Sequence, residues 1–509
     1  MSESAQQNGG SLQRFLDVVE RLGNRLPHPF MIFVYLALVV ILLSWIFSLL
    51  GVTVVDPSTE EEVPIKSLVS GAGLAYMLTS VVDNFVDFPP LGTVLTIIFG
   101  IGLAQKVGLV ENAMKKMITN APPRLVTYAV VFTGILGNLA SDAAFIIIPP
   151  LAAVAFLSAG KNPIAGLAAG FASAGAGFSA NFFISSADAL LSGISTETAR
   201  TVTDDVVVSP VSNWYFMSAS VPVLLIVGVL ITERFIEPRL GEYRGETEQE
   251  EMEEITPQEN RALRNALIAA VAYLAVLILV VLPGNSPLRN PDGGLIPSPL
   301  LQGVVPIIFL FFVTVAVAYG VTVGKITRAG DVPNLMGEAV KDMSGFIVLI
   351  FAAAQFIAYF EYSNLGTWFA VNGAEFLQDA NLTGLPALIG FILITTAFSF
   401  IIISGSALWA VLAPVFIPLF FLLDYNPAYV QAAYRIADSS TNVLTPLNPY
   451  VPLVLGFLRV YDRNAGFGTL FSLMFPYTVL FLIVWTVFFI AWSLIGLPVG
   501  PGETLYVNR

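Results

Sequence analysis

Three ionisable side chains, Asp188, Arg435 and Asp438, lie within long apolar stretches of the chain. An ionisable group at the centre of a bilayer costs about 2.5 to 3.5 kcal/mol on insertion scales, so such groups face a cavity or one another. Arg435 stays charged, and its planar guanidinium suits a carboxylate. These three residues are therefore the first candidates for binding a charged ligand or an ion.

Each candidate also has a simpler interpretation. Asp438 lies three residues after Arg435, on the same helical face, so a structural Arg435/Asp438 pair weighs evenly against ligand binding. Asp188 has no basic neighbour in its own apolar stretch, which favours a proton carrier over a solvated Asp at the end of a span. Trp409 can stack on a ligand ring or lie at the lipid interface.

Other chemistry is excluded by what the chain lacks. It has no cysteine and one histidine, His28, which excludes disulfides, thiol nucleophiles, Cys/His zinc sites and a histidine proton relay. Serines without a histidine partner disfavour a serine hydrolase. A net charge of −13 argues against nucleic acid as a partner.

The composition is that of a polytopic membrane protein. Of 509 residues, 12% are charged and 56% are hydrophobic, whereas soluble domains average about 25% charged residues. Crossing a bilayer takes about twenty apolar residues in a helix. Nine such spans are predicted, near 31–51, 92–112, 163–193, 214–237, 265–284, 300–323, 342–360, 428–457 and 468–496.

Two further apolar stretches, Leu125–Ala159 and Leu382–Leu423, are interrupted in the middle by Gly, Ser, Asn and Asp. Irregular backbone at membrane depth is tolerated only where protein or a watery cavity satisfies it. We interpret both as re-entrant hairpins, with tips near Asn138–Asp142 and Ser404–Ser406. Two ordinary spans with a polar turn remain the alternative.

Basic residues mark the cytoplasmic side of a membrane protein. Nine spans and two hairpins make basic and acidic loops alternate without violation, which predicts a cytoplasmic N-terminus and an external C-terminus. The stretch 67–86 is expected to be an interfacial helix, because a crossing would break the alternation. Eight Glu lie between Glu242 and Glu259, with Arg244 as the one base among them, which is typical of a solvated linker.

The chain thus divides into a cytoplasmic N-terminal segment (1–30), a first membrane half (31–237), an acidic linker (238–264), a second membrane half (265–496) and a C-terminal tail (497–509). The two halves are related. A shift of 264 residues aligns Asp142–Ala169 with Ser406–Ala433 without a gap and with seven identities in 28 positions. Each copy has a hairpin, an Asn-Pro turn and then a long span. By the charge topology the two hairpins open from opposite sides, as in the inverted repeats of secondary transporters.

Both long spans carry a polar patch, Gly177–Asp188 in the first copy and Tyr434–Pro449 in the second. Backbone carbonyls freed at such a break can coordinate a cation, and the start of a resumed helix favours an anion. Close packing of small residues explains the Gly and Ala of these patches, but it does not explain their ionisable residues.

At these residues the chain resembles the AbgT family of transporters, named for p-aminobenzoyl-glutamate. The resemblance covers nearly the whole length. It is carried by RLGNRLPHP (21–29), ASDAAF before IPPLAAV, KNPIAGLAAGFA, GFSAN, NWYFM, EPRLGEY, SGSALWAVLAP and VQAAYRIADSSTNVLTPLNPY. The resemblance implies an all-α homodimer whose protomer has nine spans and two hairpins, similar to elevator-type ion-coupled transporters.

The resemblance also implies transport of p-aminobenzoyl-glutamate, or export of sulfonamides driven by the proton gradient. The positions that match the family's substrate-binding residues are Asp188, Trp409, Pro427 and Arg435, and Asn138 and Asp438 match a sodium site. Two departures concern specificity: Ser399 stands where Asn is expected, and Leu408 stands where many relatives have Lys.

We therefore expect a secondary transporter of p-aminobenzoyl-glutamate or related aromatic anions in the inner membrane. Na⁺ or H⁺ is expected as coupling ion and no cofactor is expected. Lipid, a small aromatic or glutamate-containing substrate and a second copy of the chain are the expected partners. A sodium-coupled dicarboxylate or citrate carrier and, from another class, an ion channel are the alternatives. An enzyme is not expected, since no nucleophile and base form a credible pair.

Overall fold

The computed structural model describes residues 27–507 apart from positions 56, 58–60, 142, 204–205, 244, 246–254, 403 and 446. Most of the N-terminal segment and most of the acidic run in the linker lie outside the described residues. The described chain is helical except for one antiparallel hairpin of β1 (Thr53–Val55) and β2 (Glu62–Pro64). It therefore has the all-α architecture that the apolar windows predict.

The first half comprises α2 (Pro29–Leu49), α3 (Gly71–Thr79), α4 (Val81–Val86), α5 (Pro89–Lys106), α6 (Leu109–Thr119), η2 (Pro123–Leu125), α7 (Val126–Leu136), η3 (Gly137–Ala140), α8 (Ala143–Ser158), α9 (Pro163–Ala176), α10 (Ser186–Ala199), α11 (Trp214–Ile231), η4 (Thr232–Ile236) and α12 (Glu237–Leu240). The second half comprises α13 (Pro257–Val281), α14 (Pro299–Gln302), α15 (Val304–Val323), α16 (Asp331–Asp342), α17 (Ser344–Tyr362), α18 (Leu365–Asp379), α19 (Leu385–Ser399), α20 (Gly405–Leu422), α21 (Pro427–Thr441), α22 (Val451–Tyr461) and α23 (Phe467–Ile495).

Eight helical segments among the described residues are long and apolar enough to cross a membrane, or up to nine if the bent pair of α5 and α6 is one span. The eight are Pro29–Leu49, Pro123–Ala140, Trp214–Leu240, Pro257–Val281, Val304–Val323, Ser344–Tyr362, Gly405–Leu422 and Phe467–Ile495. The protein is therefore an integral membrane protein with about eight apolar spans.

Helices α5 and α13 differ in detail from the predicted segments. The span expected at 92–112 is not straight, because the chain bends by 56° between α5 and α6 at Gly108, whose φ of +88° suits glycine. Helix α13 begins at Pro257, within the segment predicted to be the acidic linker (238–264). Thr256 and Glu259 form a capping box at that start, which satisfies backbone N–H groups that have no helical partner.

The two interrupted stretches and the two spans that follow them are broken where polar residues occur. The first half runs from α7 and α8, separated at η3, to α9 and α10, separated at 177–185. The second half repeats this order, from α19 and α20, separated at 400–404, to α21 and α22, separated at 442–450. The breaks at polar residues therefore interrupt corresponding elements in the two halves.

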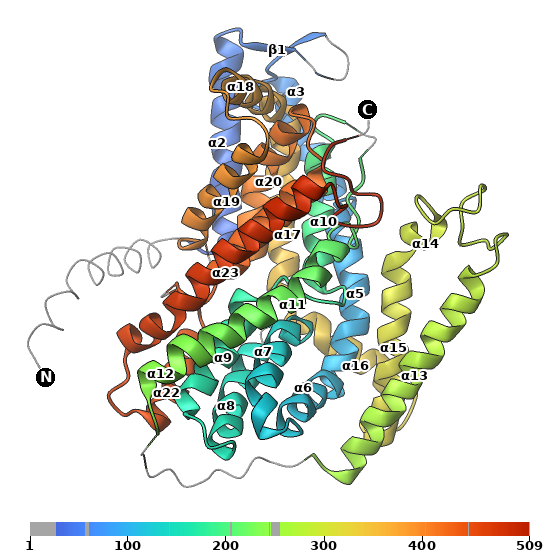
Figure 1. Ribbon diagram of the computed structural model, residues 1–509. Helices are drawn as coiled ribbons and strands as arrows, with labels where there is room; N and C mark the ends of the chain where they lie inside the picture. The colour runs from blue at the N-terminus through green and yellow to red at the C-terminus, as the bar shows by residue number, and fades with distance from the viewer. Residues whose placement is uncertain are drawn as a thin grey trace, which may run out of the picture.

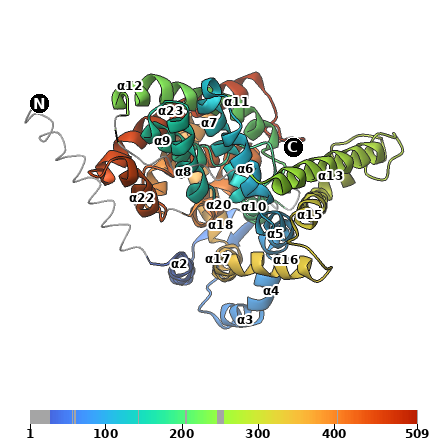
Figure 2. The same ribbon diagram turned by 90° about the horizontal axis from the view of Figure 1, so that it is seen from below.

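The helices form two neighbouring groups. Figure 2 shows the first group, α7, α8, α9, α11, α22 and α23, gathered together. The second group, α2, α16 and α17 with α13 and α15, lies beside it, and α13 with α15 extends outward. Helix α5 joins the groups, since it packs against α10 as well as α15 and α16. Figure 1 shows α11 and α23 side by side along the first group, and these two helices are in contact.

The stretch 67–86, predicted to be interfacial, folds into α3 and α4, of 9 and 6 residues. Neither approaches the roughly twenty residues that a crossing requires.

Close helix packing explains the glycines between 166 and 177. A Cβ at Gly166 would lie 2.4 Å from the Ala152 carbonyl oxygen, and one at Gly134 would lie 1.8 Å from Ser173 Oγ. Helix α9 therefore approaches α7 and α8 more closely than larger residues permit, which is the usual role of small residues between membrane helices.

The C-terminal tail is hydrogen-bonded to the residues that precede α11 and α21. Glu503 accepts hydrogen bonds from Ser212 Oγ at 2.6 Å and from Asn426 Nδ2 at 2.9 Å, and Tyr425 pairs with Tyr506 in a β-bridge. Burial raises the pKa of Glu503, and the two hydrogen bonds oppose that shift. Glu503 thereby links the segment before α11 to the start of α21.

Glu503→Ala should lower the stability of the protein, because Ser212 and Asn426 both lose their acceptor. We expect a loss of about 1 kcal/mol for each hydrogen bond, measured as a lower apparent Tm in detergent. Glu375→Ala, on the exposed face of α18, is the control and should leave Tm unchanged. Equal Tm values for the two variants would contradict a fastening role for Glu503.

Candidate functional site

The site is built where α10 resumes the chain after the first broken span. Asp188, in the first turn of α10, accepts hydrogen bonds on Oδ2 from the backbone N–H and the hydroxyl of Ser185, both at 2.7 Å. A carboxylate at this place stabilises a helix start, because the first N–H groups have no partner within the helix. Asp188 is therefore fixed by its own backbone, and its Oδ1 is left for another partner.

That partner is Arg435 of α21. Its Nη2 lies 2.5 Å from Asp188 Oδ1, and both side chains are buried, with 1% and 6% exposure. The Arg435/Asp438 pair suggested by local spacing is thus replaced by an ion pair between residues 247 positions apart. The proximity of three residues in one helix was a weaker constraint than the packing of α21 against α10.

Arg435 has further donors to offer. Its Nε and Nη1 atoms are buried, and neither has a hydrogen-bond partner among the described residues. A buried polar group without a partner costs free energy, and the cost is higher for a charged group. Such donors beside a single paired oxygen are suited to a second anion.

Trp409 lies in the interior of the protein. Its indole is fully buried, its N–H is directed at the Leu191 carbonyl oxygen at 3.1 Å and at Ser195 Oγ at 3.2 Å, and its ring packs on Tyr434 with centroids 4.5 Å apart. The indole therefore holds α20 against α10 in this structure.

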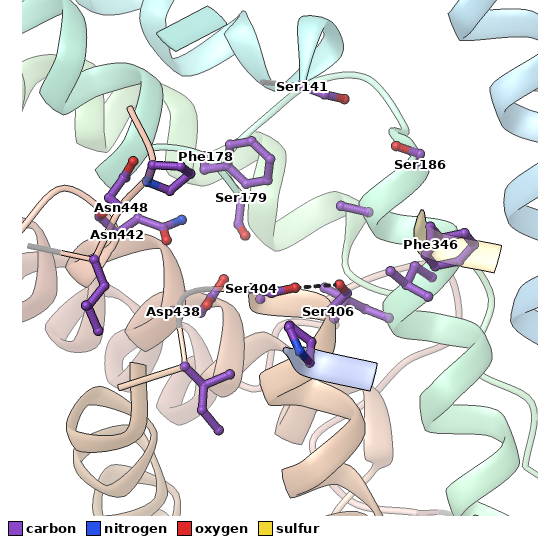
Figure 3. Close-up of a pocket in the computed structure, with 18 of the residues that line it drawn as sticks. Ser141, Phe178, Ser179, Ser186, Phe346, Ser404, Ser406, Asp438, Asn442 and Asn448 are labelled. Carbon is purple, nitrogen blue, oxygen red and sulfur yellow. Dashed lines mark hydrogen bonds between the residues drawn. The ribbon is translucent and has the colours of Figure 1, made fainter. Parts of the chain in front are cut away.

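A cavity of about 890 Å³ lies between the two groups of helices. Figure 3 shows Ser404, Ser406, Asp438, Ser179 and Asn442 around it, with Phe178 and Phe346 on its sides. Its remaining lining comes from Pro27, His28, Pro29, Ile32, Val94, Ser141, Phe145, Ser186, Ala187, Leu190, Leu191, Met343, Ile401, Ile402, Gly405, Leu447, Asn448, Pro449 and Tyr450. Hydroxyl and amide groups from the broken helices thus face aromatic and aliphatic groups, as in many small-molecule sites.

The predicted substrate-binding residues lie outside this lining. Asp188 and Arg435 lie behind the wall to which Ser186 and Leu191 contribute, and Leu191 also accepts the Trp409 N–H. Pro427 is in the first turn of α21, eight residues before Arg435, which places it about 12 Å further along the helix axis. The structure therefore brings Asp188, Arg435 and Trp409 together and leaves Pro427 near the C-terminal tail.

The two predicted sodium ligands lie beside different hairpin tips. Asp438 lines the cavity beside the second hairpin tip, where a Cβ at Gly405 would lie 2.7 Å from its Oδ2. Asn138 is buried at the first tip and donates from Nδ2 to the Phe178 carbonyl oxygen at 2.6 Å. The described residues contain no cluster of three His, Cys, Asp or Glu side chains that would hold a metal ion, so carbonyl and hydroxyl oxygens would have to complete any sodium site.

The two departures from the family pattern have clear surroundings. Ser399 shares a hydrogen bond with Thr441 at 2.6 Å, which joins α19 to α21. Leu408 is fully buried in the apolar core beside Trp409. A Lys at this position would carry its charge into that core.

The cavity contains residues that the sequence did not indicate. Ser404, Ser406 and Asn442 fall in the predicted tip and polar patch. In contrast, His28 and Met343 directly precede α2 and α17, and Phe346 lies in the first turn of α17. Nothing in the sequence pattern connects these positions to the hairpins.

Comparison with known proteins agrees with this architecture. Residues 14–507 match the AbgT putative transporter family. The chain is 44% identical over 485 residues to the p-aminobenzoyl-glutamate transport protein of Escherichia coli (strain K12), covering 95% of each chain. The family and this relative are transporters, in agreement with the expectation that the chain is not an enzyme.

Two solved structures share the fold. The YdaH transporter of Alcanivorax borkumensis has a TM-score of 0.88 at 38% identity, over 93% of this chain and 100% of that one. MtrF of Neisseria gonorrhoeae, described with a class of antimetabolite efflux pumps, has a TM-score of 0.91 at 41% identity, over 96% of this chain and 100% of that one. This integral membrane protein belongs to the AbgT family of transporters.

Proposed function

We propose that this transporter is a secondary active carrier of p-aminobenzoyl-glutamate or related aromatic anions, coupled to a proton gradient, a sodium gradient or both. The observation that carries the proposal is Arg435, a guanidinium buried behind the wall of the 890 Å³ cavity, whose Nε and Nη1 have no partner among the described residues. The E. coli relative, a p-aminobenzoyl-glutamate transport protein, supports the substrate class. MtrF, described with a class of antimetabolite efflux pumps, supports antimetabolites as further substrates, and we include sulfonamides among these as part of the proposal.

The chemistry of the site suits an aryl-glutamate. Once the guanidinium of Arg435 turns toward the cavity, its free donors bind a substrate carboxylate by charge-assisted hydrogen bonds, which are the strong kind in a buried site. The aryl ring fits between Phe178 and Phe346, which line the cavity. In this proposal Trp409 supports the site from behind the cavity wall by holding α20 against α10. Pro427 contributes to the first turn of α21.

We assign the coupling of transport to ions to the carboxylates of Asp188 and Asp438. Protonation of Asp188 would weaken its ion pair with Arg435 and so release the guanidinium toward the substrate, which links proton binding to substrate binding. Asp438 and Asn138, with carbonyls at the hairpin tips, form the proposed sodium site.

The proposed architecture has nine spans, two re-entrant hairpins and an inverted repeat, with the hairpin-bearing group moving in an elevator-like manner. We place the protein in the inner membrane as a homodimer, with a cytoplasmic N-terminus and an external C-terminus. The equal order of elements in the two halves supports the repeat.

A sodium-coupled dicarboxylate or citrate carrier is the alternative, and one observation favours it. Trp409 already packs on Tyr434 and has its N–H bonded, so it offers no free ring to an aromatic substrate in this structure. That alternative expects succinate to compete and Trp409→Ala to have no effect on transport. Two hairpins that open from opposite sides, as the charge topology predicts, favour alternating access over an ion channel.

Proteoliposomes with an imposed proton gradient test the proposal. We expect concentrative movement of p-aminobenzoyl-glutamate that an ionophore abolishes, whereas a channel would only equilibrate it. Asp188→Asn should remove the response to the proton gradient, while Asp87→Asn, on an exposed residue after α4, should not. An unchanged pH dependence in Asp188→Asn would reject Asp188 as the proton carrier.

Arg435→Lys separates substrate binding from folding. Lysine keeps a positive charge for Asp188 but lacks the Nε and Nη1 donors, so we expect about tenfold weaker binding of p-aminobenzoyl-glutamate and a smaller loss for a neutral sulfonamide. Isothermal titration measures both, with Arg200→Ala, on the exposed partner of Glu197, as control. An equal loss for both ligands would mean that Arg435 is purely structural.

Sodium should tighten substrate binding if Asn138 and Asp438 hold the ion. Titration of p-aminobenzoyl-glutamate in sodium chloride and in choline chloride should differ for the unaltered protein. The difference should vanish in Asp438→Asn and in Asn138→Ala. Identical affinities in the two salts would remove sodium from the mechanism.

A further inference from the structure

His28 belongs to the lining of the cavity, although it lies at the start of α2 rather than in a hairpin or a broken span. It is flanked by Pro27 and Pro29, which also line the cavity. Because proline fixes its own φ and restricts the residue before it, the backbone that carries His28 has little freedom to turn away.

One ring nitrogen of His28 has a defined task. Nδ1 accepts a hydrogen bond from the Phe30 backbone N–H at 3.3 Å and caps the start of α2. A ring nitrogen that accepts a hydrogen bond carries no proton, so in the neutral ring the proton is on Nε2. Within the described part of the chain no partner is found for Nε2, and the side chain is exposed. The cap thus leaves an N–H donor available at the cavity.

The charges around the cavity make that donor distinctive. Among the described residues, the lining contains one carboxylate, Asp438, and neither Lys nor Arg, so His28 is the one described lining side chain able to carry a positive charge. Among the described buried residues Arg435 is the one basic side chain, and Leu408 stands at the position where many relatives have Lys. A glutamate-containing substrate has two carboxylates, and Arg435 provides for one of them.

We infer that His28 is a substrate-binding residue whose Nε2–H donates to a substrate carboxylate on the α2 side of the cavity. This inference rests on the proposed function and extends it to the second carboxylate. Helix α2 packs on α17, whereas Arg435 belongs to α21, which packs on α23 of the first group. The substrate is therefore recognised by both groups of helices. A contact of this kind favours the conformation in which the hairpins lie next to α2.

A set of capping residues tests the inference without disturbing the helix. Asn and Asp are among the best N-cap residues, so His28→Asn and His28→Asp retain an acceptor for the Phe30 N–H while removing Nε2. We expect p-aminobenzoyl-glutamate to bind about tenfold more weakly to His28→Asn than to the unaltered protein, the effect of losing a hydrogen bond to a charged group. Binding to His28→Asp should be weaker still, because its carboxylate repels the substrate.

Isothermal titration gives the affinities, and thermal unfolding in detergent checks that the cap survives. The neutral probe p-aminobenzamide should bind equally to all three proteins. If His28→Asn has a lower Tm, His28→Ser, another strong N-cap, replaces it in the comparison. Equal affinity of the unaltered protein and His28→Asn for p-aminobenzoyl-glutamate would overturn the inference and leave His28 as a cap alone.

Failure of the inference is distinguishable from failure of the proposed function. If the unaltered protein does not bind p-aminobenzoyl-glutamate, the proposed function fails and the inference fails with it. If the unaltered protein binds and both capping variants bind equally well, the inference alone fails.

Discussion

The ion pair between Arg435 and Asp188 is the interaction on which the rest of the site depends. Each charge would be costly alone in the interior, and an ion pair offsets that cost only when its remaining donors and acceptors are satisfied. Asp188 meets this condition, because Oδ2 receives two hydrogen bonds from Ser185 while Oδ1 faces Arg435. Arg435 does not, since Nε and Nη1 have no partner in the part of the chain that the structure describes. The pair is therefore complete on the side of the helix start and open on the side of the guanidinium.

The broken helices around this pair are held by hydrogen bonds between segments far apart in sequence. The Ser179 N–H donates to Ser439 Oγ at 3.1 Å, Asn138 donates to the Phe178 carbonyl, and the Tyr434 hydroxyl donates to the Gly405 carbonyl. Backbone groups freed by a break at membrane depth must find partners within the protein. These bonds join each hairpin tip to a broken span, so a movement of one tip changes the surroundings of the cavity.

The sequence predicted the parts of this structure that depend on local pattern. Apolar windows located most spans, and Gly, Ser and Asn within them located the breaks at 137–141 and 177–185. The pairing of Arg435 was not predictable, because spacing along one helix indicates Asp438 and says nothing of α10. The positions of Trp409 and His28 were not predictable for the same reason. The packing of α20 on α10 determines the position of Trp409, and the packing of the start of α2 beside the hairpins determines that of His28.

The breaks after α9 and after α21 satisfy their free backbone groups with different side chains. After α21, Asn448 donates to the Asn442 carbonyl and accepts from the Tyr450 N–H, both at 2.9 Å, so one neutral amide connects the ends of the two helices. After α9, the start of α10 is satisfied by a carboxylate instead, and a buried carboxylate needs a cation. The first half contributes that carboxylate and the second half contributes Arg435. The ion pair therefore joins the two halves, and it does so at the side chain whose Nε and Nη1 have no partner among the described residues.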